Sequence, residues 1–135
     1  MKQLLTVLAM IVAFAAPAMA IDFTVTGATL AVTYTEPSQN ACGAPSPTCP
    51  ALTDLSHTNV YVQVGSGPEI KQANIPATAA VGGGVINTTV TVPIVAGQEA
   101  IVTISATGTD LSDNESVKSA SVTKKVDRLS PGSPN

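Results

Sequence analysis

The sequence offers one side chain of the kind that most often acts as a general base, the single histidine His57. It lies between Ser56 and Thr58. A Ser-His-Asp site needs a nucleophile on one side of the ring and a carboxylate on the other. The Gly-x-Ser-x-Gly turn that presents a nucleophilic serine does not occur. We therefore interpret His57 as an exposed loop residue, and we expect a protein that is not an enzyme, with no catalytic residue and no cofactor.

The densest group of oxygen ligands consists of Asp110, Asp113, Asn114 and Glu115. Calcium prefers carboxylate and amide oxygens, so a calcium site is one interpretation. The spacing is not that of a helix-loop-helix calcium loop, and one loop rarely supplies all the ligands that calcium takes. The alternative is that Asp110 and Asn114 close turns through hydrogen bonds from side chain to backbone. The sequence favours turns and predicts no metal ligand, and it leaves calcium binding by this loop open.

Two cysteines, Cys42 and Cys49, enclose the stretch CGAPSPTC. A close pair of cysteines in an exported chain indicates a disulfide. The prolines and the glycine between them suit a small closed loop. A redox pair is one alternative, although the spacing is not Cys-x-x-Cys. A metal site is another, although no histidine stands close in sequence. We predict a structural disulfide.

Three consecutive glycines at residues 82–84 are the only candidate for a phosphate-binding loop. Such a loop needs the N-terminus of a helix behind it. A β-branched, Thr-rich run follows instead, so a flexible hairpin is favoured.

The first residues have the organisation of a secretory signal peptide. Lys2 supplies the positive charge, and an apolar run at residues 4–16 ends in Pro17. Residues 18–20, Ala-Met-Ala, match the pattern at which such peptides are cleaved. A membrane anchor is the alternative, but the run is shorter than the roughly 20 residues that span a bilayer. We predict cleavage after Ala20, secretion or release into a periplasm, and no insertion into a membrane afterwards.

Composition narrows the range of ligands. The net charge is −3 at pH 7 and there is no basic cluster, which argues against binding to nucleic acid or to anionic membranes. Beyond the signal peptide there is no tryptophan, and the aromatic residues are Phe23, Tyr34 and Tyr61. Sugars and single-stranded nucleic acids usually stack on exposed aromatic rings. We expect all three rings in the core, which leaves little for either kind of ligand.

The clearest strand pattern lies at residues 98–107, where apolar side chains alternate with a more polar set. This period of two is typical of a strand with one buried face. A run rich in Gly, Asp, Asn and Ser follows at residues 108–116 and predicts an exposed loop. Further strands are expected at residues 23–27, 29–35, 59–64, 69–75, 85–92 and 117–126. Short strands separated by turn signals, without an amphipathic helix, predict an all-β, seven-stranded antiparallel β-sandwich.

Three segments resemble bacterial fibronectin type III domains. Residues 30–37, LAVTYTEP, are similar to the second strand of that family, in which an aromatic residue, here Tyr34, precedes a proline. Residues 51–61, ALTDLSHTNVY, resemble the loop into its third strand. Residues 97–119, GQEAIVTISATGTDLSDNESVKS, resemble its sixth strand and the following loop. The chain departs from the family in lacking a corner tyrosine early in that strand, in having Asp113 for a loop glycine, and in the added cysteine ring. The resemblance implies a fibronectin type III or immunoglobulin-like sandwich that acts as a binding or spacer module.

These observations divide the chain into a signal peptide at residues 1–20, a fibronectin type III-like sandwich at residues 21–127 and a disordered Pro- and Ser-rich tail at residues 128–135.

Alternate loops of a sandwich gather at one end, and here they are residues 38–58, 82–84 and 108–116. The expected function is the binding of a protein or extracellular-matrix partner at the cell envelope through these loops. The candidate binding residues are Asn40, Pro45, Pro47, Gly83, Asp110, Asp113, Asn114 and Glu115. The alternative is a structural subunit of a surface filament or complex that self-associates through an exposed edge strand.

Overall fold

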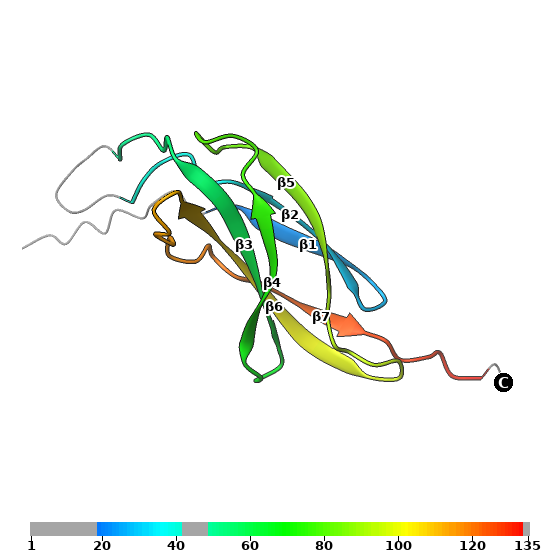
Figure 1. Ribbon diagram of the computed structural model, residues 1–135. Helices are drawn as coiled ribbons and strands as arrows, with labels where there is room; N and C mark the ends of the chain where they lie inside the picture. The colour runs from blue at the N-terminus through cyan, green and yellow to red at the C-terminus, as the bar shows by residue number, and fades with distance from the viewer. Residues whose placement is uncertain (1–18, 42–48, 134–135) are drawn as a thin grey trace, which may run out of the picture.

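The computed structural model describes residues 19–41 and 49–133 (Figure 1). These ranges contain β-strands and turns but no helix. The strands are β1 (Ile21–Thr26), β2 (Thr29–Thr35), β3 (Leu55–Val64), β4 (Glu69–Pro76), β5 (Val85–Thr91), β6 (Glu99–Asp110) and β7 (Val122–Asp127). The prediction of an all-β chain is confirmed.

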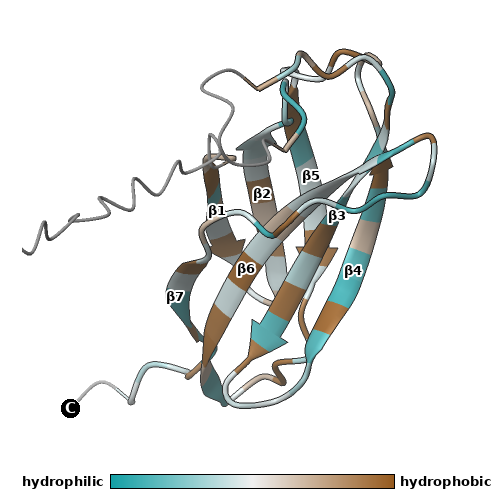
Figure 2. Ribbon diagram, turned by 90° about the vertical axis from the view of Figure 1, so that its left-hand side faces the viewer, coloured by the Kyte–Doolittle hydropathy of each residue, from teal (hydrophilic) through white to brown (hydrophobic). Residues whose placement is uncertain are grey.

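The strands form two antiparallel sheets. One sheet has three strands in the order β1-β2-β5, and the other has four in the order β4-β3-β6-β7. The chain crosses from sheet to sheet between β2 and β3, between β4 and β5, and between β5 and β6. Figure 2 shows the four-stranded sheet with β4 at one edge and β7 at the other. Two sheets with such crossing connections are the architecture of a β-sandwich.

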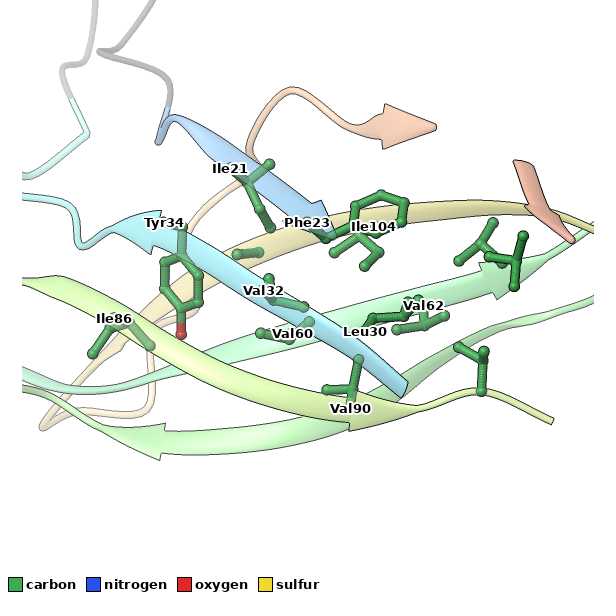
Figure 3. Packing of buried hydrophobic residues seen from close by; sticks show 14 of the residues in the cluster. Ile21, Phe23, Leu30, Val32, Tyr34, Val60, Val62, Ile86, Val90 and Ile104 are labelled. Atoms are coloured by element: carbon green, nitrogen blue, oxygen red, sulfur yellow. The ribbon is translucent and has the colours of Figure 1, made fainter. Parts of the chain in front are cut away.

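The core lies between the sheets and follows the alternation in the sequence. On β2 the buried residues are Leu30, Val32 and Tyr34, while their neighbours are exposed. In Figure 3 these side chains approach Val60 and other residues of the facing sheet. The Tyr34 hydroxyl lies 2.6 Å from Thr58 Oγ1, so its one polar atom has a partner inside the core. Burial raises the pKa of this phenol.

Most differences from the predicted strands occur at strand ends. β2 has the predicted bounds, whereas β3 begins at Leu55 instead of residue 59 and β6 continues to Asp110. β7 begins at Val122 instead of residue 117. In place of a regular ladder there, Ser116 Oγ and Ser119 Oγ accept hydrogen bonds from backbone N–H groups of β6. The backbone N–H groups of Ser116 and Ser119 also donate to Gly108 O and Ala106 O, both over 2.8 Å, so side chains and backbone share the pairing along this segment.

The sandwich is tied together along the side where β1 and β7 meet. Lys124 of β7 forms an ion pair of 2.6 Å with Asp22 of β1 and lies 4.9 Å from the ring centroid of Phe23. This contact lowers the pKa of Asp22. Within the described residues, no helix has the length and hydropathy needed to cross a membrane.

The segment before β1 packs on this fold. Met19 is buried at the edge of the core, and Ala20 O accepts a hydrogen bond of 3.3 Å from Thr35 N–H. Both residues belong to the predicted signal peptide, most of which lies outside the described residues, so the signal peptide and its cleavage stay predictions.

Candidate functional site

The described parts of three connections, residues 36–41 and 49–54, 77–84 and 111–121, lie at one end of the sandwich, which we call the loop end (Figure 1). Leu55 N–H donates to Ala80 O over 2.9 Å, and Leu111 N–H donates to Asp54 O over 2.9 Å. These backbone hydrogen bonds join all three connections. The predicted gathering of the loops is therefore confirmed for their described residues.

A buried carboxylate holds two of these connections together. Glu36 is 3% exposed. Its carboxylate accepts hydrogen bonds from Thr78 N–H at 2.8 Å, Thr78 Oγ1–H at 2.5 Å and Gly84 N–H at 3.2 Å. Glu36 N–H in turn donates to Gly84 O over 2.9 Å. The glycine-rich segment, for which the sequence predicts a flexible hairpin, is thus held to Glu36 by hydrogen bonds.

Glycine is required at this junction because backbone and side chains approach it closely. A Cβ on Gly82, where φ is +62°, would lie 1.8 Å from Pro37 O. A Cβ on Gly108 would lie 2.6 Å from Pro37 Cγ. The neighbouring Gly83, a candidate binding residue, also has a positive φ, +80°. The loop end therefore rests on a tightly packed base.

The Asp110 side chain organises the turn after β6. Its Oδ1 accepts hydrogen bonds from Ser112 N–H at 2.8 Å and Asn114 N–H at 2.9 Å, and its Oδ2 accepts one from Asn114 Nδ2 at 2.9 Å. The Asn114 amide lowers the pKa of this exposed carboxyl. Asp113 has a φ of 63°, in the left-handed region that favours glycine. The turn-forming interpretation is confirmed for Asp110, whereas the Asn114 side chain bonds the Asp110 carboxylate and not a backbone group.

Glu115 leaves this turn and lies on the outer face of the four-stranded sheet. Its Oε1 accepts hydrogen bonds from Tyr61 OH at 2.5 Å, Thr107 Oγ1–H at 2.5 Å and Asn59 Nδ2 at 3.2 Å. Lys118 Nζ lies 4.6 Å from the centroid of the Tyr61 ring on the same face. The expectation that all three aromatic rings lie in the core is wrong for Tyr61, because successive side chains of a strand point to opposite faces and its neighbours Val60 and Val62 point into the core.

This polar cluster should be visible in the pH dependence of stability. Hydrogen bonds from Thr107, and then from Tyr61, hold the pKa of Glu115 below its ordinary value of 4.5. A lowered folded-state pKa stabilises the fold above the unfolded-state pKa, and this contribution is lost as the pH falls through the folded-state value. Because Glu115 is exposed, we expect Glu115→Gln to cost less than about 1 kcal/mol at pH 7. As the pH falls below 4.5 and through the folded-state pKa, the two proteins should converge in urea unfolding.

A second variant tests whether the pH dependence of stability comes from the hydrogen bonds to Glu115 or from its charge alone. In a Tyr61→Phe background, the pH-dependent difference caused by Glu115→Gln should shrink, because one of the donors to Glu115 is gone. Parallel stability curves for the chains with glutamate and with glutamine at pH 3 to 7 would contradict the assignment of this network.

A groove runs between residues 39–41 and the chain that follows β6. It consists of two adjoining hollows of about 300 Å³ and about 180 Å³. The residues shared by both, by which we define the loop-end groove, are Pro37, Gln39, Asn40, Ala41 and Ser116. The larger hollow is also lined by Asp110, Asn114 and Glu115, and the smaller one by Met19, Val117 and Lys118.

The groove brings together half of the predicted binding residues. Asn40, Asp110, Asn114 and Glu115 line it. Gly83 and Asp113 belong to the loop end but are not among the lining residues. Pro45 and Pro47 lie outside the described residues. So does Cys42, and the disulfide with Cys49 therefore stays a prediction.

His57 lies within β3, half-buried, with its Nδ1 3.2 Å from Ser56 Oγ. The interpretation of His57 as an exposed loop residue is wrong, because β3 starts earlier than the sequence indicates. Among the residues that the structure describes, no group of three or more histidine, cysteine and carboxylate side chains is arranged to hold a metal ion.

Sequence reasoning missed Glu36 and the outer-face cluster around Glu115. Glu36 is a charged residue next to a proline, where a turn is the ordinary interpretation. One usable signal in the sequence was Asn59, a polar residue at the start of a Val-rich run. In the structure its side chain is fully buried and bonds Thr107 and Thr109.

The fold and the loop-end groove define a class, an all-β protein of two antiparallel sheets with hydrogen-bonded loops at one end. Comparison with family models, with curated proteins and with solved structures found no match to this chain.

Proposed function

We propose that the chain is a secreted, non-enzymatic, fibronectin type III-like module that binds a protein or matrix partner at the cell envelope through its loop end. The observation that carries the proposal is the loop-end groove, in which Asn40, Asp110, Asn114 and Glu115 line one surface. Concave sites with mixed apolar and polar walls are typical places for recognition.

Three features support the fibronectin type III-like type. Tyr34, which takes the family's aromatic position before a proline, is a buried core residue that bonds Thr58. Asp113, which stands where the family has a loop glycine, has the positive φ that such a glycine would have. The separation into sheets of three and four strands agrees with a seven-stranded sandwich of this kind.

The base of the loop end supports a binding role. Glu36, Pro37 and the glycines packed on them hold the loop backbones in place. A loop that is already ordered loses less conformational entropy when it binds a partner. At the groove, Val117 is 82% exposed. An exposed apolar side chain beside polar lining residues is suited to contact with a protein surface.

The test compares the two ends of the sandwich. A photo-activatable cross-linking residue is placed at Asn40 or Val117, and in a control at Val95, which lies in the connection between β5 and β6 and is 58% exposed. In the native host we expect one dominant cross-linked partner from the first two positions and none from Val95. The partner is then purified, and its affinity is measured for Val117→Asp and for the matched Val95→Asp.

We expect Val117→Asp to weaken binding at least about tenfold and Val95→Asp to leave it unchanged, because only the first introduces a charge into the contact. Equal effects of the two substitutions, or cross-linking from Val95 alone, would exclude the loop end as the binding site.

A second candidate function is a structural subunit joined by edge-strand pairing. It is favoured by β5, which is paired with β2 alone among the described strands and has no charged residue in VINTTVT. Uncharged edges are open to pairing with another chain. Concentration-dependent species that grow beyond a dimer in size-exclusion chromatography would support this function, and a chain that stops at a monomer or dimer would count against it.

A further inference from the structure

The edge strand β4 exposes most of its residues. Among the described strands it is hydrogen-bonded only to β3, and in Figure 2 it forms one edge of the four-stranded sheet. Its outer row of backbone N–H and C=O groups is therefore available to a strand from another molecule. This feature lies along the side of the sandwich and takes no part in the loop-end groove.

The register of β4 places two opposite charges on one face and an apolar residue on the other. Glu69 is opposite Gln63 and Lys71 is opposite Tyr61, whose side chain lies on the outer face of the sheet. Ile70 between them is opposite Val62, a core residue, and so faces the inside of the sandwich.

Ile70 is 49% exposed although it faces inwards, because the sandwich is open along this side. It lines an apolar hollow of about 130 Å³ together with Val62, Val64 and Pro93. An inward-facing isoleucine at an open edge gains stability if a second strand covers it.

We propose that two copies of this chain pair antiparallel along β4, related by a two-fold axis through Ile70. In this register Glu69 of each copy is opposite Lys71 of the other, and the two Ile70 side chains meet on the axis. Opposite charges in directly facing positions stabilise an antiparallel pair. The two four-stranded sheets then become one continuous sheet of eight strands.

The charges also decide between registers. A register centred on Lys71 places the two lysines opposite each other, which is destabilising. A lysine on an edge strand ordinarily discourages pairing, but in the proposed register each lysine is neutralised by a glutamate of the other copy. The bulge of β4 against Val60 and Tyr61 ends the regular stretch after Lys71, so the contact is short.

A two-fold contact of this kind uses the same surface on both copies and closes on itself. It therefore makes a dimer and not a filament. The inference goes beyond the binding proposed for the loop end and does not depend on it. If the chain does not dimerise through β4, the binding proposed for the loop-end groove is unaffected. If the groove binds no partner, the proposed dimer is unaffected.

The test uses charge variants in sedimentation equilibrium, with protein from the micromolar range up to about 1 mM, since short edge contacts are weak. We expect Glu69→Lys alone and Lys71→Glu alone to weaken self-association at least about tenfold, because both reciprocal pairs become repulsive. An equimolar mixture of the two variants should associate like the unchanged chain. The double variant Glu69→Lys/Lys71→Glu should do the same by itself.

Two controls accompany these charge variants. Glu69 also bonds Lys118 within the same copy, so Lys118→Gln tests whether loss of that ion pair alone changes association, and we expect that it does not. Urea unfolding of each variant shows that the fold is kept. A strict monomer over the whole concentration range, or single variants that associate like the unchanged chain, would overturn the proposal.

Disulfide cross-linking tests whether the two-fold axis passes through Ile70. Ile70→Cys should form an intermolecular disulfide under mild oxidation, because directly opposite residues of an antiparallel pair lie close enough for one. In the matched control Asn74→Cys, the two cysteines would be separated by eight residues along the strand, about 26 Å, and no cross-link is expected. Equal cross-linking of both variants would mean that collisions, and not the proposed register, bring the cysteines together.

Discussion

Replacing Glu36 by alanine is expected to lower the free energy of unfolding by about 2–4 kcal/mol. The carboxylate accepts hydrogen bonds from two backbone N–H groups, those of Thr78 and Gly84, in a place where Glu36 itself is buried. Removing the acceptor breaks three part-buried hydrogen bonds, and those to a charged group contribute more to stability than neutral ones. Urea unfolding of the purified domain at neutral pH measures the change.

A matched surface variant calibrates this effect. Glu99→Ala removes an exposed carboxylate that forms an ion pair of 2.6 Å with Lys125, and it should change stability by less than about 1 kcal/mol. If Glu36→Ala is as mild as Glu99→Ala, the connection at residues 77–84 is not held by the buried carboxylate.

The second large effect is expected for Gly82→Ala, at about 3 kcal/mol or more. The new Cβ would lie 1.8 Å from Pro37 O, a backbone atom that moves only with the loop, and φ is +62°. Two separate costs therefore add, a steric clash and an unfavourable backbone conformation. Thermal unfolding followed by circular dichroism is a suitable measurement.

Gly97→Ala is the matched control for this substitution. Gly97 also has a positive φ, +83°, but a Cβ there meets no atom within 4 Å. Only the backbone cost of about 1–2 kcal/mol applies. Equal losses in the two variants would show that the clash with Pro37 is relieved by movement of the loop.

Strand positions were predictable wherever side chains alternate over a whole strand. β2 alternates from end to end, and its bounds agree with those expected. In β6 the residues Val102, Ile104 and Ala106 face the core as expected. Alternation works in both places because one face of each strand is buried and the pattern is local.

The ends of β3, β6 and β7 were not predictable in the same way, because long-range pairing decides them. β6 continues to Asp110 since Leu55 of β3 is paired with it. The outer face of β6 also buries Ser105, Thr107 and Thr109, polar residues that the sequence assigns to the exposed face of the strand or to the loop after it. They are buried because Glu115 and the serines after it return along β6 and cover them, a contact that local sequence does not specify.

In the candidate site, too, local features were predictable and long-range contacts were not. Turn chemistry at Asp110 is local, and the structure agrees with it. The groove beside them depends on how residues 39–41 pack against a segment that is distant in the sequence. The anchoring of the glycine-rich segment by Glu36 depends on a contact between residues 48 positions apart. Such contacts are set by topology, and pattern analysis of one sequence does not reach them.

The directions of the first and last strands have a mechanical consequence. β1 starts at the loop end, and β7 ends at the opposite end of the sandwich (Figure 1). A tension applied to the two ends of the domain therefore runs parallel to both strands. The ladder between β1 and β2, and that between β6 and β7, would be loaded in shear, so that their hydrogen bonds resist together instead of opening one after another. A domain held at both ends would therefore resist tension without losing the hydrogen bonds of these ladders one at a time.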